Sequence, residues 1–243
     1  MQKFSFLIPC YNCEKFILSN GIKLLKKIKI NNINFEIFFL NDGSKDDSLK
    51  ELKKLKKKYK IIKIVNFNIN KGKSAVLKKN INRTKGNIIV FYDCDLPYFN
   101  YFNSVVKLLK KGNDFVTIDR RAIDSKFYYT NSNFYQIFRF FISKFVNILI
   151  SFTILNKYSG DTQSGLKGFK VIKNLKNKKF ISNKFFLDAE IISFFDRKNL
   201  KITSVPIKYK ISKTSSIKIL DLNNLLYFYE LFKIILNKSI KLR

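Results

Sequence analysis

Two carboxylates flank a cysteine in Asp93-Cys94-Asp95, directly after the apolar run Ile88-Ile89-Val90-Phe91-Tyr92. Because the run is rich in β-branched residues, it predicts a buried strand with both carboxylates just beyond its carboxyl end. Mg²⁺ commonly takes one or two carboxylates and completes its coordination with water and the phosphate oxygens of a substrate. The motif therefore indicates a divalent-cation site for a phosphorylated ligand, although a lone pair with this spacing is also typical of a solvated turn.

The elements that must position this motif alternate between strand and helix along the first half of the chain. Apolar runs predict strands over residues 4–8, 36–40, 61–65, 88–92 and 115–118, with helical stretches around 14–29, 46–59, 73–84 and 99–111. Such alternation is typical of an α/β fold with a mostly parallel sheet and helices on both faces, which binds ligands beyond the carboxyl ends of its strands. Ser44 and Asp47 have the spacing of a capping box, so Asp47 is expected to begin a helix.

Two further segments are amphipathic. Residues 133–155 are strongly apolar and aromatic, but Arg139 and Lys144 leave uncharged parts shorter than the roughly 20 residues that span a bilayer. A helix lying in the membrane interface, with its cations near lipid phosphates, is one interpretation, and a buried core helix is the other. The tail, residues 221–243, predicts a second helix that either anchors to a surface or packs on the sheet.

The excess of basic over acidic residues indicates an anionic partner but does not identify which kind. The 243 residues include 48 Lys and Arg against 17 Asp and Glu, a net charge of +31. This excess favours an anionic partner, such as nucleic acid, an anionic membrane face or a phosphorylated substrate. A hydrophobic content of 46% excludes disorder as a description of the whole chain, and the length suits one large α/β domain. Lys is abundant together with Ile, Asn and Phe, so part of the charge reflects compositional bias.

Cys10, Cys13 and Cys94 are an odd number of cysteines without the density of a disulfide scaffold, which fits a reducing compartment. Cys10 and Cys13 form a C-x-x-C where a strand meets a helix, which leaves a thioredoxin-like redox role open. A structural zinc site is not expected, because it usually takes four ligands and the chain has no His. The first residues lead straight into a strand and Pro9, without a secretory segment, so we expect a cytoplasmic location.

Five motifs, in order along the chain, resemble the family 2 glycosyltransferases of the GT-A fold, whose sheet is Rossmann-like. They are Ile8-Pro9-Cys10-Tyr11-Asn12, Asn41-Asp42-Gly43-Ser44, Asn70-Lys71-Gly72-Lys73, Asp93-Cys94-Asp95-Leu96 and Asp161-Thr162-Gln163-Ser164-Gly165-Leu166-Lys167. The last looks most like the D-T-Q-x-G-[FL]-K segment of the dolichyl-phosphate glucosyltransferase branch of the polyprenyl-phosphate enzymes. The resemblance covers roughly residues 4–220. It implies a GT-A domain over residues 1–220 that includes the segment 133–155, followed by the amphipathic helix of residues 221–243.

On the donor side, the resemblance implies a role for each matching residue. Pro9 and Tyr11 would line the nucleoside, and Asp42 would accept hydrogen bonds from the base, as a carboxylate can from a uracil N–H. Lys71 would face the nucleotide phosphates. Asp93-Cys94-Asp95 matches the site of a Mg²⁺ or Mn²⁺ ion that neutralises charge on the departing nucleoside diphosphate. The alternatives are that Asp42 caps the following helix and that Lys71 is an exposed loop lysine.

On the acceptor side, Arg120 matches an Arg expected near the acceptor phosphate, which a guanidinium can hold bidentately. Arg121 is adjacent, so the match could be shifted by one residue. Asp161 and Gln163 match the D-T-Q segment and are expected to hold the donor sugar or the acceptor head group. Asp188 resembles one of two acids that open a late helix, although acids in a first turn are also favoured by the helix dipole.

The chain departs from the family pattern at two places. The family usually has a Glu directly after Tyr-Asn, where this chain has Cys13 followed by Glu14, so the nucleoside contacts of that loop stay open. Ser204 stands where a Glu commonly precedes the Val-Pro segment. Cations that the family places against phosphate correspond to Lys210, Lys213 and Lys218.

The resemblance implies inverting transfer from a nucleotide-sugar to a polyprenyl phosphate at the cytoplasmic face of an anionic membrane. Such an acceptor barely needs a general base, since a phosphomonoester has a second pKa of about 6 and is largely dianionic at neutral pH. A saccharide hydroxyl acceptor is the alternative, and Asp188 would then be the base. The D-T-Q segment favours UDP-glucose as donor, with GDP-mannose open. A basic nucleic-acid-binding protein is the less favoured alternative, and we expect no nucleic-acid partner.

Overall fold

A seven-stranded mixed sheet forms the centre of the molecule in the computed structural model, which describes residues 2–122, 126–128, 134–155, 160–210 and 223–240. The strand order is β3-β2-β1-β4-β7-β5-β8. All pairs are parallel except those of β7, which runs antiparallel to both β4 and β5. The strands are β1 (Phe4–Cys10), β2 (Phe35–Asp42), β3 (Ile62–Phe67), β4 (Ile88–Tyr92), β5 (Phe115–Asp119), β7 (Leu166–Lys170) and β8 (Ile202–Pro206).

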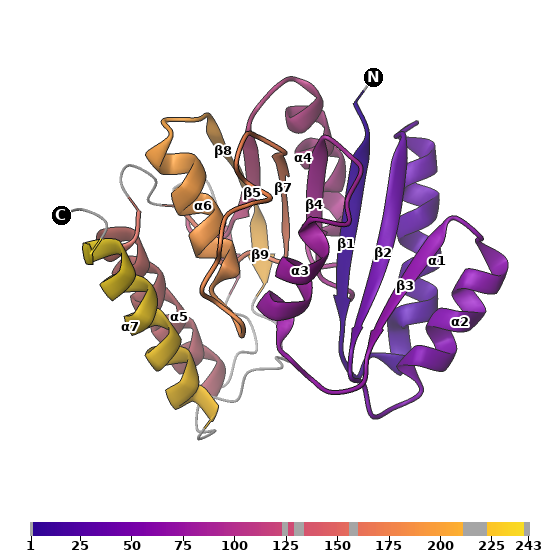
Figure 1. Cartoon of the computed structure of the whole chain (residues 1–243), viewed down its shortest axis with the longest axis horizontal. Coiled ribbons are helices and arrows are strands. Elements are labelled where there is room, and N and C mark those ends of the chain that lie inside the picture. The colour runs from indigo at the N-terminus through magenta and orange to yellow at the C-terminus, as the bar shows by residue number, and fades with distance from the viewer. Residues whose placement is uncertain (1, 123–125, 129–133, 156–159, 211–222, 241–243) are drawn as a thin grey trace.

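Helices cover both faces of this sheet (Figure 1). They are α1 (Glu14–Ile30), α2 (Ser48–Lys58), α3 (Lys73–Ile81), α4 (Phe102–Lys110), α5 (Phe134–Thr153), α6 (Leu187–Arg197) and α7 (Asn223–Ile240), with a 3₁₀ turn η1 (Phe99–Tyr101) before α4. A short parallel pair, β6 (Lys126–Tyr128) and β9 (Lys208–Lys210), stands apart from the main sheet. The α/β class and the mostly parallel sheet predicted from the sequence are therefore confirmed.

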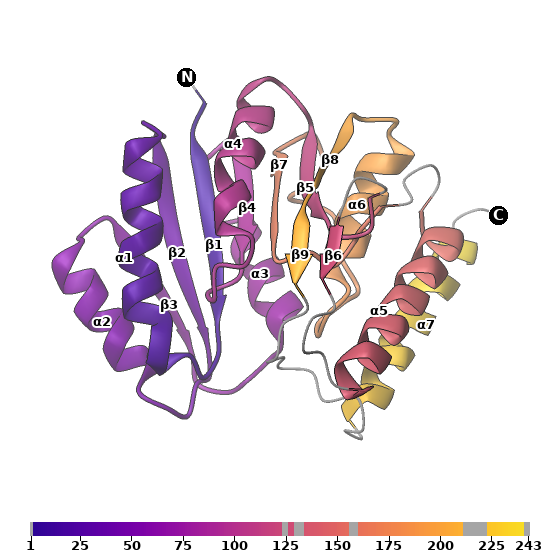
Figure 2. The ribbon, with the colours of Figure 1, turned by 180° about the vertical axis from the view of Figure 1, so that it is seen from behind.

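The continuous apolar runs arise because both faces of the central strands are buried. Along β1, Phe4, Phe6 and Ile8 enter one core cluster with side chains of α1, α2 and α4. Leu7, which points the other way, enters a second cluster with side chains of α3, α6, α5 and α7. Figures 1 and 2 show α5 and α7 along the same end of the molecule.

One local detail differs from the expectations. Asp47 stands at the N-cap position of α2, as expected, but the capping box does not form. The Ser44 hydroxyl instead donates to Asn41 Oδ1 and accepts the N–H of Asn12. In the described part of the chain, every helix is too short or too polar to cross a bilayer.

Candidate active site

The loops that follow β1 and β2 are fastened to each other at the carboxyl edge of the sheet. Asn12 Oδ1 accepts the N–H of Lys45 at 2.9 Å, and Glu14 Oε2 accepts the N–H of Asp47 at 2.8 Å. In this loop Pro9 is buried as part of β1, whereas Tyr11 keeps 44% of its surface exposed. Tyr11 is therefore the side chain of this loop that is open to a ligand, while Glu14 holds the two loops together.

Asp42, buried at the end of β2, organises the loop that leads into α3. Its two oxygens accept the backbone N–H groups of Lys71 at 2.7 Å and Gly72 at 2.9 Å. Gly72 has φ +95°, and a Cβ at this position would lie 2.7 Å from the carbonyl oxygen of Asn183, so the loop needs glycine here. Lys71 places its ammonium 5.9 Å from the centre of the Phe67 ring. Base recognition by Asp42 stays a prediction.

Five charged side chains from β4, α3, β7 and α6 form a cluster beyond the carboxyl end of β4. Lys73 Nζ lies 2.5 Å from Asp93 Oδ1, and Lys167 Nζ lies 2.5 Å from Asp188 Oδ2. Burial opposes the charge on Lys73, but Asp93, Asp188 and Asp95 raise the pKa of its ammonium. Burial lowers the pKa of Lys167, against the pull of Asp188. Two ammonium groups and three carboxylates leave this charged cluster with a net charge of −1.

Asp93 and Asp95 have different surroundings within the charged cluster. Asp93 is paired with Lys73, and its N–H donates to the carbonyl oxygen of Gly165 at 2.9 Å. In the described part of the chain Asp95 has no ion pair, and desolvation and the charge of Asp93 raise the pKa of its carboxyl. A divalent cation would relieve this repulsion, and carboxylate oxygens are hard donors, so the two residues fit Mg²⁺ or Mn²⁺.

A second charged group surrounds the fully buried Asp161. Its carboxylate accepts Nε of Arg120 and, at 3.0 Å, a terminal nitrogen of Arg120, and it lies 2.6 Å from a terminal nitrogen of Arg121. Burial alone would raise the pKa of Asp161, but the two guanidinium groups hold it well below its usual range. The two arginines keep 19% and 14% of their side-chain surface exposed. Asp119 Oδ1 also accepts the N–H of Arg121 at 2.8 Å, and the charge of Asp119 acts on the Arg121 guanidinium, so two carboxylates face the two arginines.

The segment from Asp161 to Lys167 joins the two charged groups. The carbonyl oxygen of Gln163 accepts a hydrogen bond from Arg120, and that of Gly165 accepts one from Asp93. A Cβ on Gly165 would lie 2.7 Å from Asp93 Oδ2, so this close approach requires glycine. The D-T-Q segment therefore places the arginine pair and the carboxylate motif at adjoining ends of β5, β7 and β4.

Buried polar atoms of this region that make no hydrogen bond within the described part of the chain include Asp188 Oδ1, in the first turn of α6, Gln163 Nε2 and the Tyr92 hydroxyl at the end of β4. Buried polar atoms in proteins are nearly always paired, so such atoms commonly mark contacts with a ligand or an ion. A ligand, an ion or a water molecule would complete the hydrogen bonding of Asp188 and Gln163, and their contact with substrate stays a prediction.

The sequence matches a known protein family. The sequence pattern of glycosyl transferase family 2 matches residues 5–180, well over half of the chain. The chain belongs to this family. Along 93% of its length it is 27% identical to a dolichyl-phosphate beta-glucosyltransferase of Trichomonas vaginalis, covering 74% of that protein. A second dolichyl-phosphate beta-glucosyltransferase of the same organism is 28% identical over 88% of the chain and 68% of its own length.

Solved structures agree on the fold of this family 2 glycosyltransferase. The glucosyl-3-phosphoglycerate synthase of Mycobacterium tuberculosis, in complex with Mn²⁺ and UDP-glucose, superposes with a TM-score of 0.64. The match covers 96% of this chain and 79% of that chain at 16% identity. At this identity the likeness shows a GT-A-type fold.

Lys73 and Lys167 belong to motifs seen in the sequence, but neither residue had a role or a partner that the sequence predicted. Lys73 lies in the Asn70 to Lys73 motif, but its contact with Asp93 depends on how α3 meets β4. Lys167 pairs with Asp188 because β7 is inserted beside β4, with Phe91 opposite Lys167. Of the cations expected against phosphate, Lys213 and Lys218 lie outside the described residues, as does the side chain of Lys210.

Proposed function

We propose that this family 2 glycosyltransferase moves a sugar from a nucleotide-sugar, UDP-glucose in the first instance, to a polyprenyl phosphate at the cytoplasmic face of a membrane. Two relatives are dolichyl-phosphate beta-glucosyltransferases, which supports this donor and this class of acceptor. The Mycobacterium tuberculosis structure holds Mn²⁺ with UDP-glucose, which supports a divalent cation and a nucleotide-sugar. The assignment to this chain rests on how its own residues would serve the reaction.

The charged cluster suits the donor diphosphate. Asp93 and Asp95 would hold a Mg²⁺ or Mn²⁺ ion, and Lys73 adds a protein cation beside the same carboxylate. When bound, the ion neutralises the negative charge that develops on the departing nucleoside diphosphate. Tyr11 and Pro9 would line the nucleoside, with Asp42 holding the loop of Lys71 against it. We thus place the leaving group between the loops that follow β1, β2 and β4.

The arginine pair suits the acceptor phosphate. Arg120 and Arg121 meet at Asp161 and each keeps part of its side chain exposed, so their guanidinium groups would face a phosphate dianion. A guanidinium can offer two parallel N–H donors to phosphate and fix its orientation. A phosphate oxygen needs no deprotonation before it attacks the anomeric carbon. The forming bond lies opposite the breaking bond in a single displacement, so the reaction inverts the configuration of the sugar.

The exposed apolar face of α5 is the main observation in support of a lipid acceptor. Its exposed side chains recur every three or four residues, and Phe152 keeps 85% of its surface exposed. Among the side chains of α5 that the structure describes, the exposed large apolar ones are Phe138, Phe141, Phe145, Ile148 and Phe152. On its buried face, Asn147 Oδ1 accepts both N–H and Oγ1–H of Thr162, at 3.0 and 2.9 Å. One helix therefore joins an apolar outer surface to the D-T-Q segment beside the arginines.

Helix α7 adds to this surface. Tyr229, Phe232 and Leu236 are exposed at intervals of three and four residues, and Lys233 is exposed among them. Its inner side is fixed by the buried Glu230, which accepts the N–H groups of Asn183 and Lys184 at 2.6 and 2.9 Å. Helices with an exposed apolar face and nearby cations bind the boundary between acyl chains and lipid phosphates. We propose that α5 and α7 bring the site to the membrane surface.

The test is transfer in vitro with a panel of radiolabelled nucleotide-sugars, polyprenyl phosphate in vesicles and Mn²⁺ or Mg²⁺. We expect label to enter the organic extract with one donor, UDP-glucose first, and only when polyprenyl phosphate is present. The same assay with oligosaccharide acceptors separates the second candidate function. That candidate is supported by one observation, the buried Oδ1 of Asp188, which makes no hydrogen bond in the described part of the chain and would accept the proton of a hydroxyl acceptor. Label found in oligosaccharide and absent from lipid would replace the lipid proposal.

A further inference from the structure

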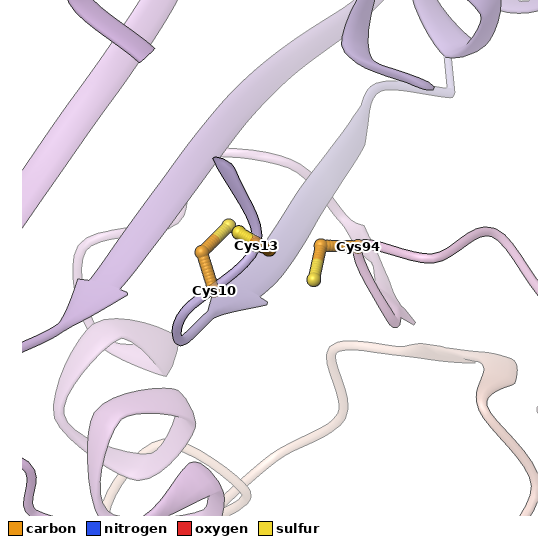
Figure 3. Close-up of side chains that lie close together, drawn as sticks. All are labelled: Cys10, Cys13 and Cys94. Carbon is orange, nitrogen blue, oxygen red and sulfur yellow. The ribbon is translucent and has the colours of Figure 1, made fainter. Parts of the chain in front are cut away.

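All three cysteines of the chain converge on one point, although they come from three segments (Figure 3). Cys10 ends β1, Cys13 stands at the N-cap position of α1, and Cys94 lies between the two carboxylates that follow β4. Their three Sγ atoms all lie within 4.8 Å of one another, and none is in a disulfide. Chain geometry explains the meeting, because β1 pairs with β4 in a register that, carried on, sets Cys10 opposite Cys94.

The spacing of the sulfurs is close to that of a metal–thiolate site. A cation bound at about 2.3 Å from each of three sulfurs in a tetrahedral arrangement, as zinc is, holds them about 3.8 Å apart. The observed upper limit of 4.8 Å exceeds this by about 1 Å. Rotation of side chains is enough to close such a gap, so the backbone need not move.

The surroundings of this thiol cluster favour a soft cation over a hard one. Cys10 and Cys13 are each 1% exposed, and their neighbours in the core are apolar. Ser48 Oγ, which accepts the N–H of Cys13, lies 3.5 Å from the sulfur of Cys13. Cys94 is only half-buried, which leaves a side from which water can reach the sulfurs. Three thiolates and one water make a complete four-ligand set for a thiophilic ion.

We propose that Cys10, Cys13 and Cys94 bind one thiophilic d¹⁰ divalent cation of the zinc type, with water as the fourth ligand. The divalent charge offsets more of the three thiolate charges than a monovalent ion would. This thiol site differs from the carboxylate site next to it, because soft sulfur donors discriminate against Mg²⁺ and Mn²⁺. Since Cys94 lies between Asp93 and Asp95, the bound ion would also fix the loop that carries the two carboxylates.

Titration of the fully reduced protein with Cd²⁺ tests this site, because sulfur-to-cadmium charge transfer gives an ultraviolet band. We expect a band that saturates at one equivalent per chain in the presence of excess Mg²⁺. Cys10→Ser, Cys13→Ser and Cys94→Ser, each checked for folding by circular dichroism, should each weaken Cd²⁺ binding at least tenfold. Asp95→Asn is the matched control beside Cys94, and it should leave the band unchanged.

A second measurement needs no variant. Zn²⁺ should slow the reaction of the three thiols with a thiol reagent at least tenfold, and a chelator should restore the original rate. The proposal is overturned if the reduced protein shows no saturable band, as expected of a purely redox role for the C-x-x-C pair. It is equally overturned if Cys94→Ser keeps the full band, or if Asp95→Asn loses it, because the ion would then lie elsewhere.

Discussion

Lys73 Nζ lies 2.5 Å from Asp93 Oδ1, so the protein itself already neutralises one carboxylate of the Asp93-Cys94-Asp95 motif. Asp95 has no such ion pair in the described part of the chain, and the charge of Asp93 helps to raise its pKa. The two acids therefore differ, although the sequence shows them as a symmetric pair. If the two acids bind a divalent cation, as we propose, Lys73 would compete with that cation for Asp93.

Replacing Lys73 with methionine separates the effect of its ammonium on cation binding from its effect on sugar transfer. Removal of the ammonium should tighten Mn²⁺ binding by about tenfold, because the net charge of the cluster becomes more negative. Sugar transfer should nevertheless fall by one to two orders of magnitude, roughly, because the leaving diphosphate loses a counter-charge. Electron paramagnetic resonance of free Mn²⁺ measures the binding. Lys50→Met, which removes an exposed lysine paired with Asp47, is the control and should change neither quantity. Unchanged or weaker Mn²⁺ binding in Lys73→Met would contradict the competition.

Asp161→Asn should destabilise the fold strongly. The carboxylate is fully buried between Arg120 and Arg121, and its loss leaves two partly buried guanidinium groups facing each other. Breaking a buried pair in this way typically costs about 3–5 kcal/mol. Urea unfolding measures the change in free energy, with Asp47→Asn as the control, since Asp47 belongs to an exposed ion pair. Equal effects of the two substitutions would show that the arginines do not depend on Asp161.

Glu36 should make the free energy of unfolding depend on pH in the acid range. Burial opposes its charge, but hydrogen bonds from Lys63, the N–H of Lys85 and the Ser5 hydroxyl lower its pKa from 4.5 to about 2. A depressed carboxyl pKa contributes stability above the unfolded value and loses it as pH falls through the folded value. The difference in unfolding free energy between wild type and Glu36→Gln should therefore be constant above about pH 5 and shrink toward about pH 2. A difference that stays constant across that range would refute the role of Glu36.

The exposed face of α5 should govern membrane binding. Phe141→Ser combined with Phe145→Ser removes two large side chains that are 59% and 64% exposed. Because apolar burial in lipid drives interfacial binding, flotation with anionic vesicles should drop on the order of tenfold or more. Ile30→Ser, at the end of α1, removes an apolar side chain that is 80% exposed and should not matter. Equal flotation of the double variant and the wild type would remove α5 from the membrane surface.

The sequence predicted strands that carry an apolar run and missed a strand that lacks one. The strands β1, β2, β4 and β5 are visible because both of their faces are covered, and the edge strand β3 is visible from its isoleucines and valine although its burial is mixed. Strand β7 was not expected, because Leu166-Lys167-Gly168-Phe169-Lys170 contains two lysines and a glycine. Lys167 is buried here only because Asp188, far along the chain, neutralises it. A pairing of that kind has no local signature.

The same limit applies to the candidate site. The sequence predicted that the site lies beyond the carboxyl ends of the strands, and the acidic motif does lie beyond β4. The ion-pair partners of the site residues could not be predicted, since Lys73 meets Asp93 and Arg120 meets Asp161 only through tertiary packing. Asn147 illustrates the point, because it lies in the apolar segment 133–155 and its side chain holds Thr162 in the structure. The third cysteine joined the other two for a related reason, the register of β1 against β4.

The most direct test is lipid-extractable transfer from UDP-glucose to polyprenyl phosphate, measured for wild type and Asp95→Asn with Mn²⁺ and with excess chelator. The account predicts rapid transfer only in the wild type with Mn²⁺, and a fall of at least about a hundredfold in Asp95→Asn, because charge on the leaving diphosphate is no longer balanced. Full transfer in the presence of chelator, or in Asp95→Asn, would contradict it.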